Sequence, residues 1–240
     1  DQAMKGVDGV FHFAALWLLH CWEYPRSAFE VNIHGTFNIV EAIVNNGVKR
    51  FVYSSSASVY GDAVTEPMEE DHPYNNNNFY GATKIAGEHM IRALYHRYKD
   101  TEQHFDYAGL RYMNVYGARQ DYRGTYIAVI MKILDRLDKG LPPIVYGDGS
   151  QAYDFIYVRD TGAANVCAMK SDATDSFYNV GRGVKTTIKE LAELILKATG
   201  SDLQIQYEPA GQTFVKNRVG SPKKAEKEIG FKYKVGLEDG

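Results

Sequence analysis

The sequence contains little of what builds a disulfide framework or a membrane span. It has only two cysteines, Cys21 and Cys167, which are too few for a disulfide scaffold and lead us to expect a protein of the reducing cytoplasm. The longest apolar run, residues 13–19, is far below the ~20 residues that a membrane helix needs. The formal net charge of −3 gives no electrostatic reason to expect nucleic acid or an anionic membrane as a partner.

The rest of the composition is that of an ordinary globular protein, with 45% hydrophobic and 24% charged residues. The short apolar run 10–14 predicts a buried strand, and residues 50–54 predict the next one. Residues 27–46 and 80–98 predict helices, the first because its apolar residues recur at spacings of three and four. Strands that alternate with helices of this length predict an α/β fold with a doubly wound parallel sheet.

After residue 117 the elements become shorter. We expect a helix over 126–137, a strand over 153–158 and a further strand over 176–180. A helix over 188–198 should begin at Thr187, because Thr187 and Glu190 have the spacing of a capping box.

Tyr80 and Lys84 form the most informative local pattern. They lie four residues apart, so a helix places both on one face. A nearby ammonium favours phenolate, and we therefore expect the pKa of Tyr80 to fall below its usual value of about 10. A serine hydroxyl of the cluster 54–58, at the end of the preceding strand, could share the proton. Such a group suits general acid/base chemistry on a carbinol.

A second Tyr-x-x-x-Lys pattern, Tyr95 to Lys99, shows that the spacing alone is weak evidence in a chain with 18 tyrosines. No strand end rich in hydroxyls precedes this second pair, and we expect it to lie on the surface. Tyr80 instead follows Ser56 by 24 residues, across a polar loop.

Further motifs occur in order along the chain. They are Phe11-His-Phe-Ala-Ala-Leu16, Val31-Asn-Ile-His-Gly-Thr36, Leu110-Arg-Tyr-Met-Asn-Val-Tyr-Gly117 and Gly147-Asp-Gly-Ser-Gln-Ala-Tyr-Asp-Phe155. Together with Tyr80 and Lys84, they make the chain resemble the extended short-chain dehydrogenase/reductase family, specifically its nucleotide-sugar epimerases and dehydratases. The resemblance implies a Rossmann-like fold, with residues 1–117 as a partial dinucleotide-binding domain. Residues 118–240 would be mostly a substrate lobe, from which about 153–180 return to the first domain.

The resemblance also implies roles for individual residues. The catalytic residues would be Ser56, Tyr80 and Lys84. NAD would be the cofactor, bound by Phe13, Ala14, Ala15, Ser54, Tyr80, Lys84 and Tyr112. The nucleotide sugar would be bound by Ser56, Asn114, Tyr153 and Arg218. No metal site is expected.

Some of these positions have a structural alternative. Residues 13–15 could belong to a plain core strand, Asn114 could be a buried structural amide, and Asn32 reads as a buried polar brace and not as a ligand. Relatives usually clamp the diphosphate with arginine, but Tyr153 stands where that arginine is expected. Arg218 is the nearest candidate to replace it.

Ala57 indicates which reaction to expect. Dehydratases of the family carry an acidic residue in this turn, so its absence favours epimerisation, as in UDP-hexose 4-epimerases. The alternatives are a dehydrogenase or reductase, a dehydratase, or a binding protein without turnover. By analogy with the family, helices 27–46 and 80–98 would pair in a homodimer.

The chain contains no Gly-x-x-Gly-x-x-Gly, the kind of glycine-rich loop that cradles a dinucleotide pyrophosphate. Residues 1–9 resemble the segment that precedes the fourth strand of such sheets. We therefore expect the chain to be a fragment of a longer enzyme.

Overall fold

The computed structural model describes residues 2–121, 128–210 and 215–240. Its centre is a four-stranded sheet in the order β1-β2-β3-β8, in which all neighbouring strands are parallel. The strands are β1 (Gly9–His12), β2 (Arg50–Ser56), β3 (Asp106–Tyr112) and β8 (Ser176–Val180). The predicted α/β fold with a parallel, Rossmann-like sheet is confirmed.

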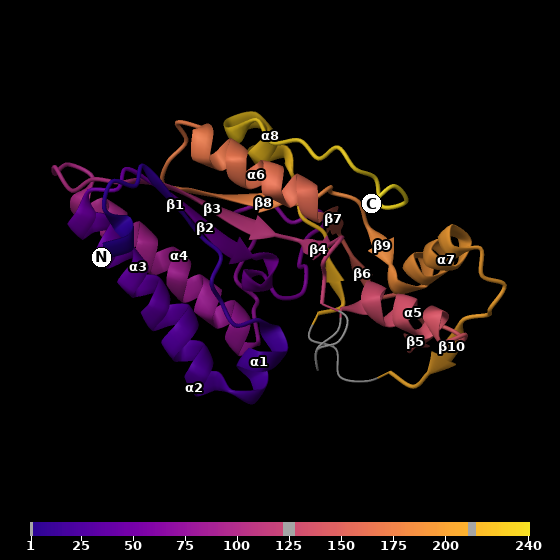
Figure 1. Ribbon diagram of the computed structural model, residues 1–240. Coiled ribbons are helices and arrows are strands. Elements are labelled where there is room, and N and C mark those ends of the chain that lie inside the picture. The colour runs from indigo at the N-terminus through magenta and orange to yellow at the C-terminus, as the bar shows by residue number, and fades with distance from the viewer. Residues whose placement is uncertain (1, 122–127, 211–214) are drawn as a thin grey trace.

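Helices cover both faces of the sheet (Figure 1). One face carries α3 and α4, and the other carries α6 and α8. The helices of this half are η1 (Gln2–Met4), α1 (Leu18–Glu23), α2 (Pro25–Ala28), η2 (Phe29–His34), α3 (Gly35–Asn46), η3 (Ala57–Val59), α4 (Phe79–Tyr98), α6 (Val158–Lys170) and α8 (Lys223–Ile229).

The helix predicted over 27–46 differs from a regular α-helix. Its middle, η2, is a π-helix between α2 and α3. Asn32 lies in this wider segment, and its side chain holds both the N–H and the carbonyl of Leu16, at 2.7 and 2.8 Å. π-helical turns often occur at functional sites.

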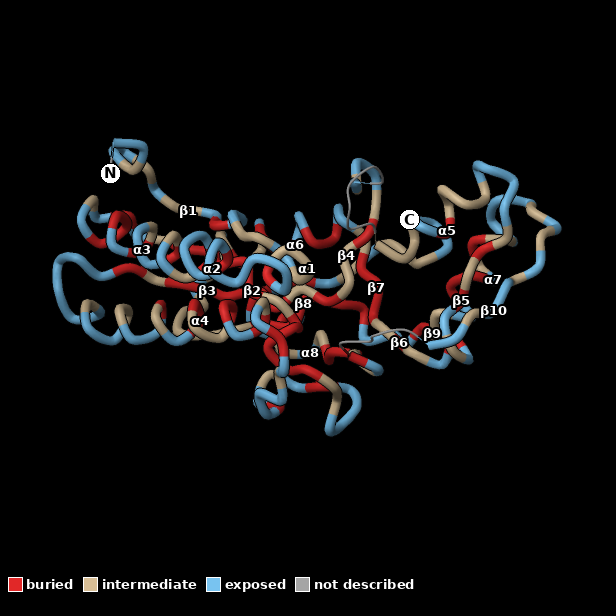
Figure 2. The backbone as a smooth tube through the Cα atoms, turned by 90° about the horizontal axis from the view of Figure 1, so that it is seen from below, coloured by how far each residue is buried: buried red, intermediate tan, exposed pale blue. Residues whose placement is uncertain are grey.

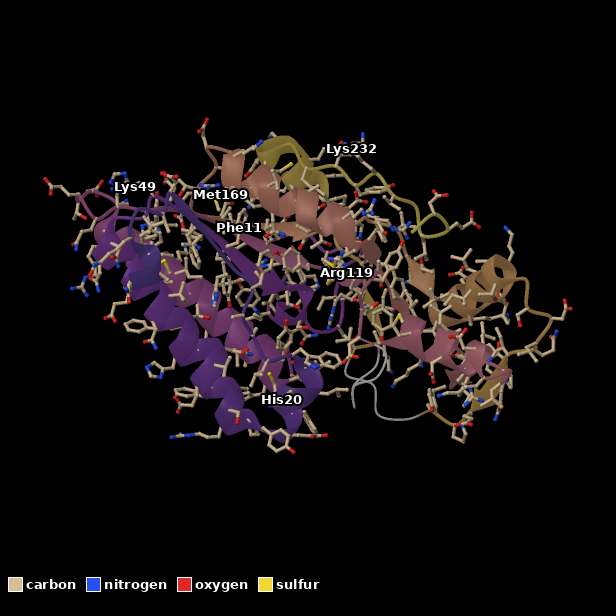
Figure 3. The ribbon with its side chains drawn as sticks, viewed as in Figure 1. Phe11, His20, Lys49, Arg119, Met169 and Lys232 are labelled. Carbon is tan, nitrogen blue, oxygen red and sulfur yellow. The ribbon has the colours of Figure 1, made fainter. Side chains whose placement is uncertain are left out.

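The core lies in two layers because alternate strand residues point to opposite faces. Phe51 and Tyr53 of β2 pack toward α3 and α4, in a cluster with Ile43 and Ile91. Val52 packs on the other face with the small side chains of α6. Both faces of the sheet are therefore buried at β2 and β3, whose middle residues are red in Figure 2.

A second half is built from segments that alternate along the chain with α6, β8 and α8 of the first half. It has its own hydrophobic cluster, which includes Tyr116, Ile133, Val145, Phe155 and Leu191. Its helices are α5 (Val129–Asp138) and α7 (Ile188–Thr199). Its strands are β4 (Asn114–Tyr116), β5 (Ile144–Tyr146), β6 (Ala152–Tyr153), β7 (Phe155–Tyr157), β9 (Thr186–Thr187), β10 (Gln206–Glu208) and β11 (Asn217–Arg218).

The single strand predicted over 153–158 is wrong, since β6 and β7 belong to different sheets. Asp154 lies between them, and its buried carboxylate accepts hydrogen bonds from the backbone N–H groups of Arg182 and Gly183, at 3.0 and 2.8 Å. The side chain of Asp154 points into the protein at the residue where the chain passes from the sheet of β6 to the sheet of β7.

Two helix starts in this half can be compared with the sequence. The capping box is confirmed, because Thr187 Oγ1 accepts from the N–H of Glu190 and the Glu190 carboxylate accepts from the N–H of Thr187. The start predicted at residue 126 lies outside the described residues, and the described helix begins at Val129. Among the helices that the structure describes, none has the length and apolar content to cross a bilayer.

The close packing of α4 on β2 at Gly87 can be tested by measuring stability. A methyl group added at Gly87, in α4, would overlap the hydroxyl of the buried Tyr53. We expect Gly87→Ala to lower the free energy of unfolding by roughly 1–3 kcal/mol, the usual cost of overpacking, as measured by urea denaturation. Gly162→Ala, in α6, is the matched control because its methyl group would meet nothing. It should be neutral or stabilising, and equal effects of the two variants would contradict the packing.

Candidate active site

The predicted catalytic residues lie at the carboxyl edge of the sheet, where parallel α/β sheets bind ligands. β2 ends at Ser56, whose Oγ caps the short helix η3 by accepting the N–H of Ser58 at 3.1 Å. α4 begins beside this turn, with Asn78 Oδ1 accepting the N–H of Gly81 at 2.9 Å. Only glycine fits at position 81, because a side chain would strike the carbonyl of Ser58.

Ser56, Tyr80 and Lys84 meet at this point. The ammonium of Lys84 donates a hydrogen bond to the carbonyl of Ser54 at 2.6 Å and lies 5.7 Å from the centre of the Tyr80 ring. The Ser56 side chain lies close enough to the Tyr80 hydroxyl to hold the pKa of the phenol down. Ser56 of β2 and the pair Tyr80 and Lys84 of α4, which the sequence predicts to be catalytic, thus lie together in the structure.

The expected fall in the pKa of Tyr80 is wrong. Burial raises the pKa of Tyr80 to about 12, and hydrogen bonding with Ser56 and the charge of Arg218 offset only part of this rise. Burial also lowers the pKa of Lys84 to about 8. Both groups are withdrawn from water, which disfavours the charged form of each.

The residues predicted to bind the cofactor border the same edge. Residues 13–15 lie beyond the end of β1, and Phe13 is 58% exposed, so they are not part of a core strand. The hydroxyls of Ser54 and Tyr112 are 3.1 Å apart. Lys84 has three N–H donors and uses one of them on the described residues, which leaves two for a bound molecule.

A cavity of about 720 Å³ lies between this edge and the second half of the chain. Asn114, Tyr153 and Arg218, all predicted to bind substrate, line it together with Trp17 and Lys132. Its size is that of a small-molecule site. Tyr153 Oη donates to the carbonyl of Val215 at 2.7 Å, so this hydroxyl is engaged within the protein.

Several contacts beneath the site are not visible in the sequence. The buried carboxylate of Glu88, one turn after Lys84, accepts from Arg111 Nε and Nη2 at 2.9 and 2.7 Å. It also accepts from Ser55 Oγ at 2.5 Å. This ion pair ties α4 to β2 and β3 directly below the predicted catalytic residues. Glu88 and Arg111 are 23 residues apart, so no local pattern links them.

A second buried network, of Asn32 and Cys21, reaches α4 at Thr83 and Lys84. Asn32 is a polar brace, as expected, since it also donates to Thr83 Oγ1 at 3.1 Å. Cys21 was not predicted to take part. Its buried thiol donates to the carbonyl of Leu16 at 3.2 Å and interacts electrostatically with Lys84 and Tyr80.

The second Tyr-x-x-x-Lys pattern is only partly as predicted. Lys99 is exposed, but Tyr95 is half-buried and packs edge-on against Phe105 and Tyr107. It lies at the far end of α4 from Tyr80.

Comparison with known proteins agrees with this geometry. Residues 1–181 match the model of the "NAD dependent epimerase/dehydratase family". A UDP-glucose 4-epimerase of Bacillus subtilis is 30% identical over 99% of this chain and 74% of its own length.

Two solved structures extend the comparison. The UDP-N-acetylglucosamine 4-epimerase of Methanobrevibacter ruminantium, in complex with UDP-N-acetylmuramic acid, is 32% identical with a TM-score of 0.91, over 99% of this chain and 74% of that one. MoeE5, in complex with UDP-glucuronic acid and NAD, is 30% identical with a TM-score of 0.89, over 100% and 78%.

The buried amine of Lys84 makes a prediction about stability. Its pKa is about 8 in the folded protein, against an ordinary value of 10.5, so protonation favours the unfolded state. The resulting penalty is complete below pH 8 and disappears as the pH rises toward 10.5. We expect Lys84→Met to unfold at higher urea concentration than the wild type at pH 7, with the difference shrinking between pH 8 and 10.5. A difference that stays constant with pH would contradict the assignment.

Proposed function

The chain belongs to the NAD dependent epimerase/dehydratase family, and from this we propose that it inverts one carbinol of a UDP-linked hexose through a transient keto-sugar. The similar proteins described above act on or bind UDP-sugars. The observation that carries the proposal is the contact of Ser56, Tyr80 and Lys84 beside a cavity of about 720 Å³.

The residues of the cofactor edge fit the cofactor of the family. NAD, when bound, supplies reversible acceptance of hydride from the carbinol carbon. The two unused donors of Lys84 suit the hydroxyls of a ribose, and Tyr80 stands beside them. Ser54 and Tyr112 offer a pair of hydroxyls, and residues 13–15 offer exposed backbone at the end of β1.

Ser56 and Tyr80 would move the proton. Tyr80 Oη accepts the proton of the sugar hydroxyl through Ser56 Oγ. It returns the proton after the keto-sugar has rotated in the cavity to present its other face. Because burial raises the pKa of Tyr80 to about 12, the phenolate is a strong base once it forms. The positive charges of Lys84 and Arg218 lie close enough to stabilise it.

The cavity would hold the nucleotide sugar. Asn114, Tyr153 and Arg218 line it, and Lys132 and Arg136 supply cations for the diphosphate. The turn at Ala57 contains no carboxylate, which suits epimerisation over elimination of water. We place the protein in the cytoplasm because it has two cysteines, both free.

A homodimer through α3 and α4 is part of the proposal. These helices lie side by side on the outside of the sheet (Figure 1), and large apolar side chains are exposed on and before α3. These are Trp22, Tyr24, Phe29, Val31 and Phe37. An exposed apolar surface of this kind is typical of an interface.

Replacement of the phenol tests the function. We expect Tyr80→Phe in the NAD-loaded protein to lower the rate of UDP-hexose epimerisation by at least 100-fold, because general acid/base groups contribute about 10²–10⁴-fold. Tyr95→Phe is the matched control, since it removes a tyrosine hydroxyl from the same helix at the second Tyr-x-x-x-Lys pattern, and it should keep the wild-type rate. Retained turnover by Tyr80→Phe would overturn the assignment, and stoichiometric accumulation of NADH by the wild type would indicate a dehydrogenase instead.

The dimer has a separate test. Phe37→Glu places a charge on the exposed surface of α3, and we expect it to change the sedimentation of the protein from a dimer to a monomer of 27.0 kDa. Val64→Glu is the control, because Val64 is also exposed but lies outside these helices. A wild-type protein that sediments as a monomer would refute the interface.

A further inference from the structure

Arg218 occupies an unusual position for an arginine. It lies in β11, which pairs in parallel with β6 so that Arg218 is opposite Tyr153. It lines the cavity described above, and Nη1 lies 3.5 Å from the hydroxyl of Ser58. Within the described part of the chain its Nε is shielded from solvent and has no hydrogen-bond partner.

Among the described residues, no carboxylate forms an ion pair with this side chain. The arginines that form ion pairs among the described residues are Arg26, Arg92 and Arg111. Asp62 is the acidic residue that interacts electrostatically with Arg218, but its carboxylate accepts the backbone N–H groups of Lys216 and Asn217. Burial lowers the pKa of Arg218, as expected for a guanidinium withdrawn from water.

Arg218 is partly buried, and a guanidinium in such a position that forms no ion pair is costly; the cost falls when an anion binds to it. A guanidinium has five N–H donors in a planar fork that matches the two oxygens of a carboxylate or phosphate. Arg218 therefore fits an anionic group of the molecule that enters the cavity.

The location of Arg218 indicates which part of the substrate carries the anionic group that it would bind. Ser58 belongs to the turn that begins at Ser56, and Arg218 is close enough to Tyr80 for its charge to lower the pKa of the phenol. The group next to Tyr80 and Ser56 must be the sugar ring, because these residues act on its carbinol. A diphosphate has other cations, since Lys132 and Arg136 also line the cavity.

We propose that Arg218 is a specificity-determining residue that binds a carboxylate on the sugar ring, so that the preferred substrate is a UDP-linked hexuronic acid over the neutral hexose. This inference rests on the proposed function and names the substrate class of the same site. The neutral sugar would leave the guanidinium unpaired, and a polar group left unpaired in a site is what produces discrimination.

Binding of three ligands to the full chain tests the proposal without turnover. Isothermal titration would compare UDP, UDP-glucose and UDP-glucuronic acid on the wild type, Arg218→Met and Arg218→Lys. We expect the wild type to bind UDP-glucuronic acid roughly 10- to 100-fold more tightly than UDP-glucose, the range for a charge-assisted pair. Arg218→Met should lose this difference and bind UDP like the wild type. Arg218→Lys, which keeps the charge without the fork, should retain a smaller difference.

Three results separate the possible failures. Equal affinity of the wild type for the two sugars would overturn this inference alone. Equal weakening of all three ligands by Arg218→Met would also overturn it, because the arginine would then bind the diphosphate. Failure of the wild type to bind UDP at all would overturn the proposed function and the inference with it. The affinity of each variant for UDP also shows whether its fold is intact.

Discussion

The hydrogen bond from the buried ammonium of Lys84 to the carbonyl of Ser54 is the contact on which the rest of the site depends. It joins α4 to the carboxyl end of β2, so the first turn of the helix lies against the turn that begins at Ser56. Tyr80, one turn earlier on the same face, is thereby directed at Ser56. The absence of a side chain at Gly81 permits this approach.

Burial gives these groups their chemical character. Lys84 and Tyr80 are withdrawn from water, and their pKa values move apart, from ordinary values of 10.5 and 10.0 to about 8 and about 12. The ion pair of Glu88 with Arg111 holds the same helix from below, with both side chains nearly inaccessible. A rigid support of this kind maintains the geometry of groups that the solvent would otherwise separate.

The parts of the structure that depend on local spacing could be predicted from the sequence. The parallel sheet follows from alternating strands and helices, and the pairing of Tyr80 with Lys84 follows from one helical turn. The break at Asp154 depends on backbone groups about thirty residues away, and the position of Arg218 depends on the pairing of β11 with β6. Neither contact leaves a periodic signal. The predicted fall in the pKa of Tyr80 was wrong because the spacing of Tyr80 and Lys84 reveals the neighbouring charge but not the loss of water around the phenol.

In the proposed reaction the sugar is oxidised and reduced again at one carbon, and Tyr80 handles only the hydroxyl proton. UDP-hexose with deuterium at the reacting carbon tests it directly in ordinary water. The hydrogen removed from that carbon is returned to its other face, so mass spectrometry of the epimer should find the deuterium retained. Loss of the deuterium to solvent would show that the C–H bond is broken by a base, and that result would contradict the account.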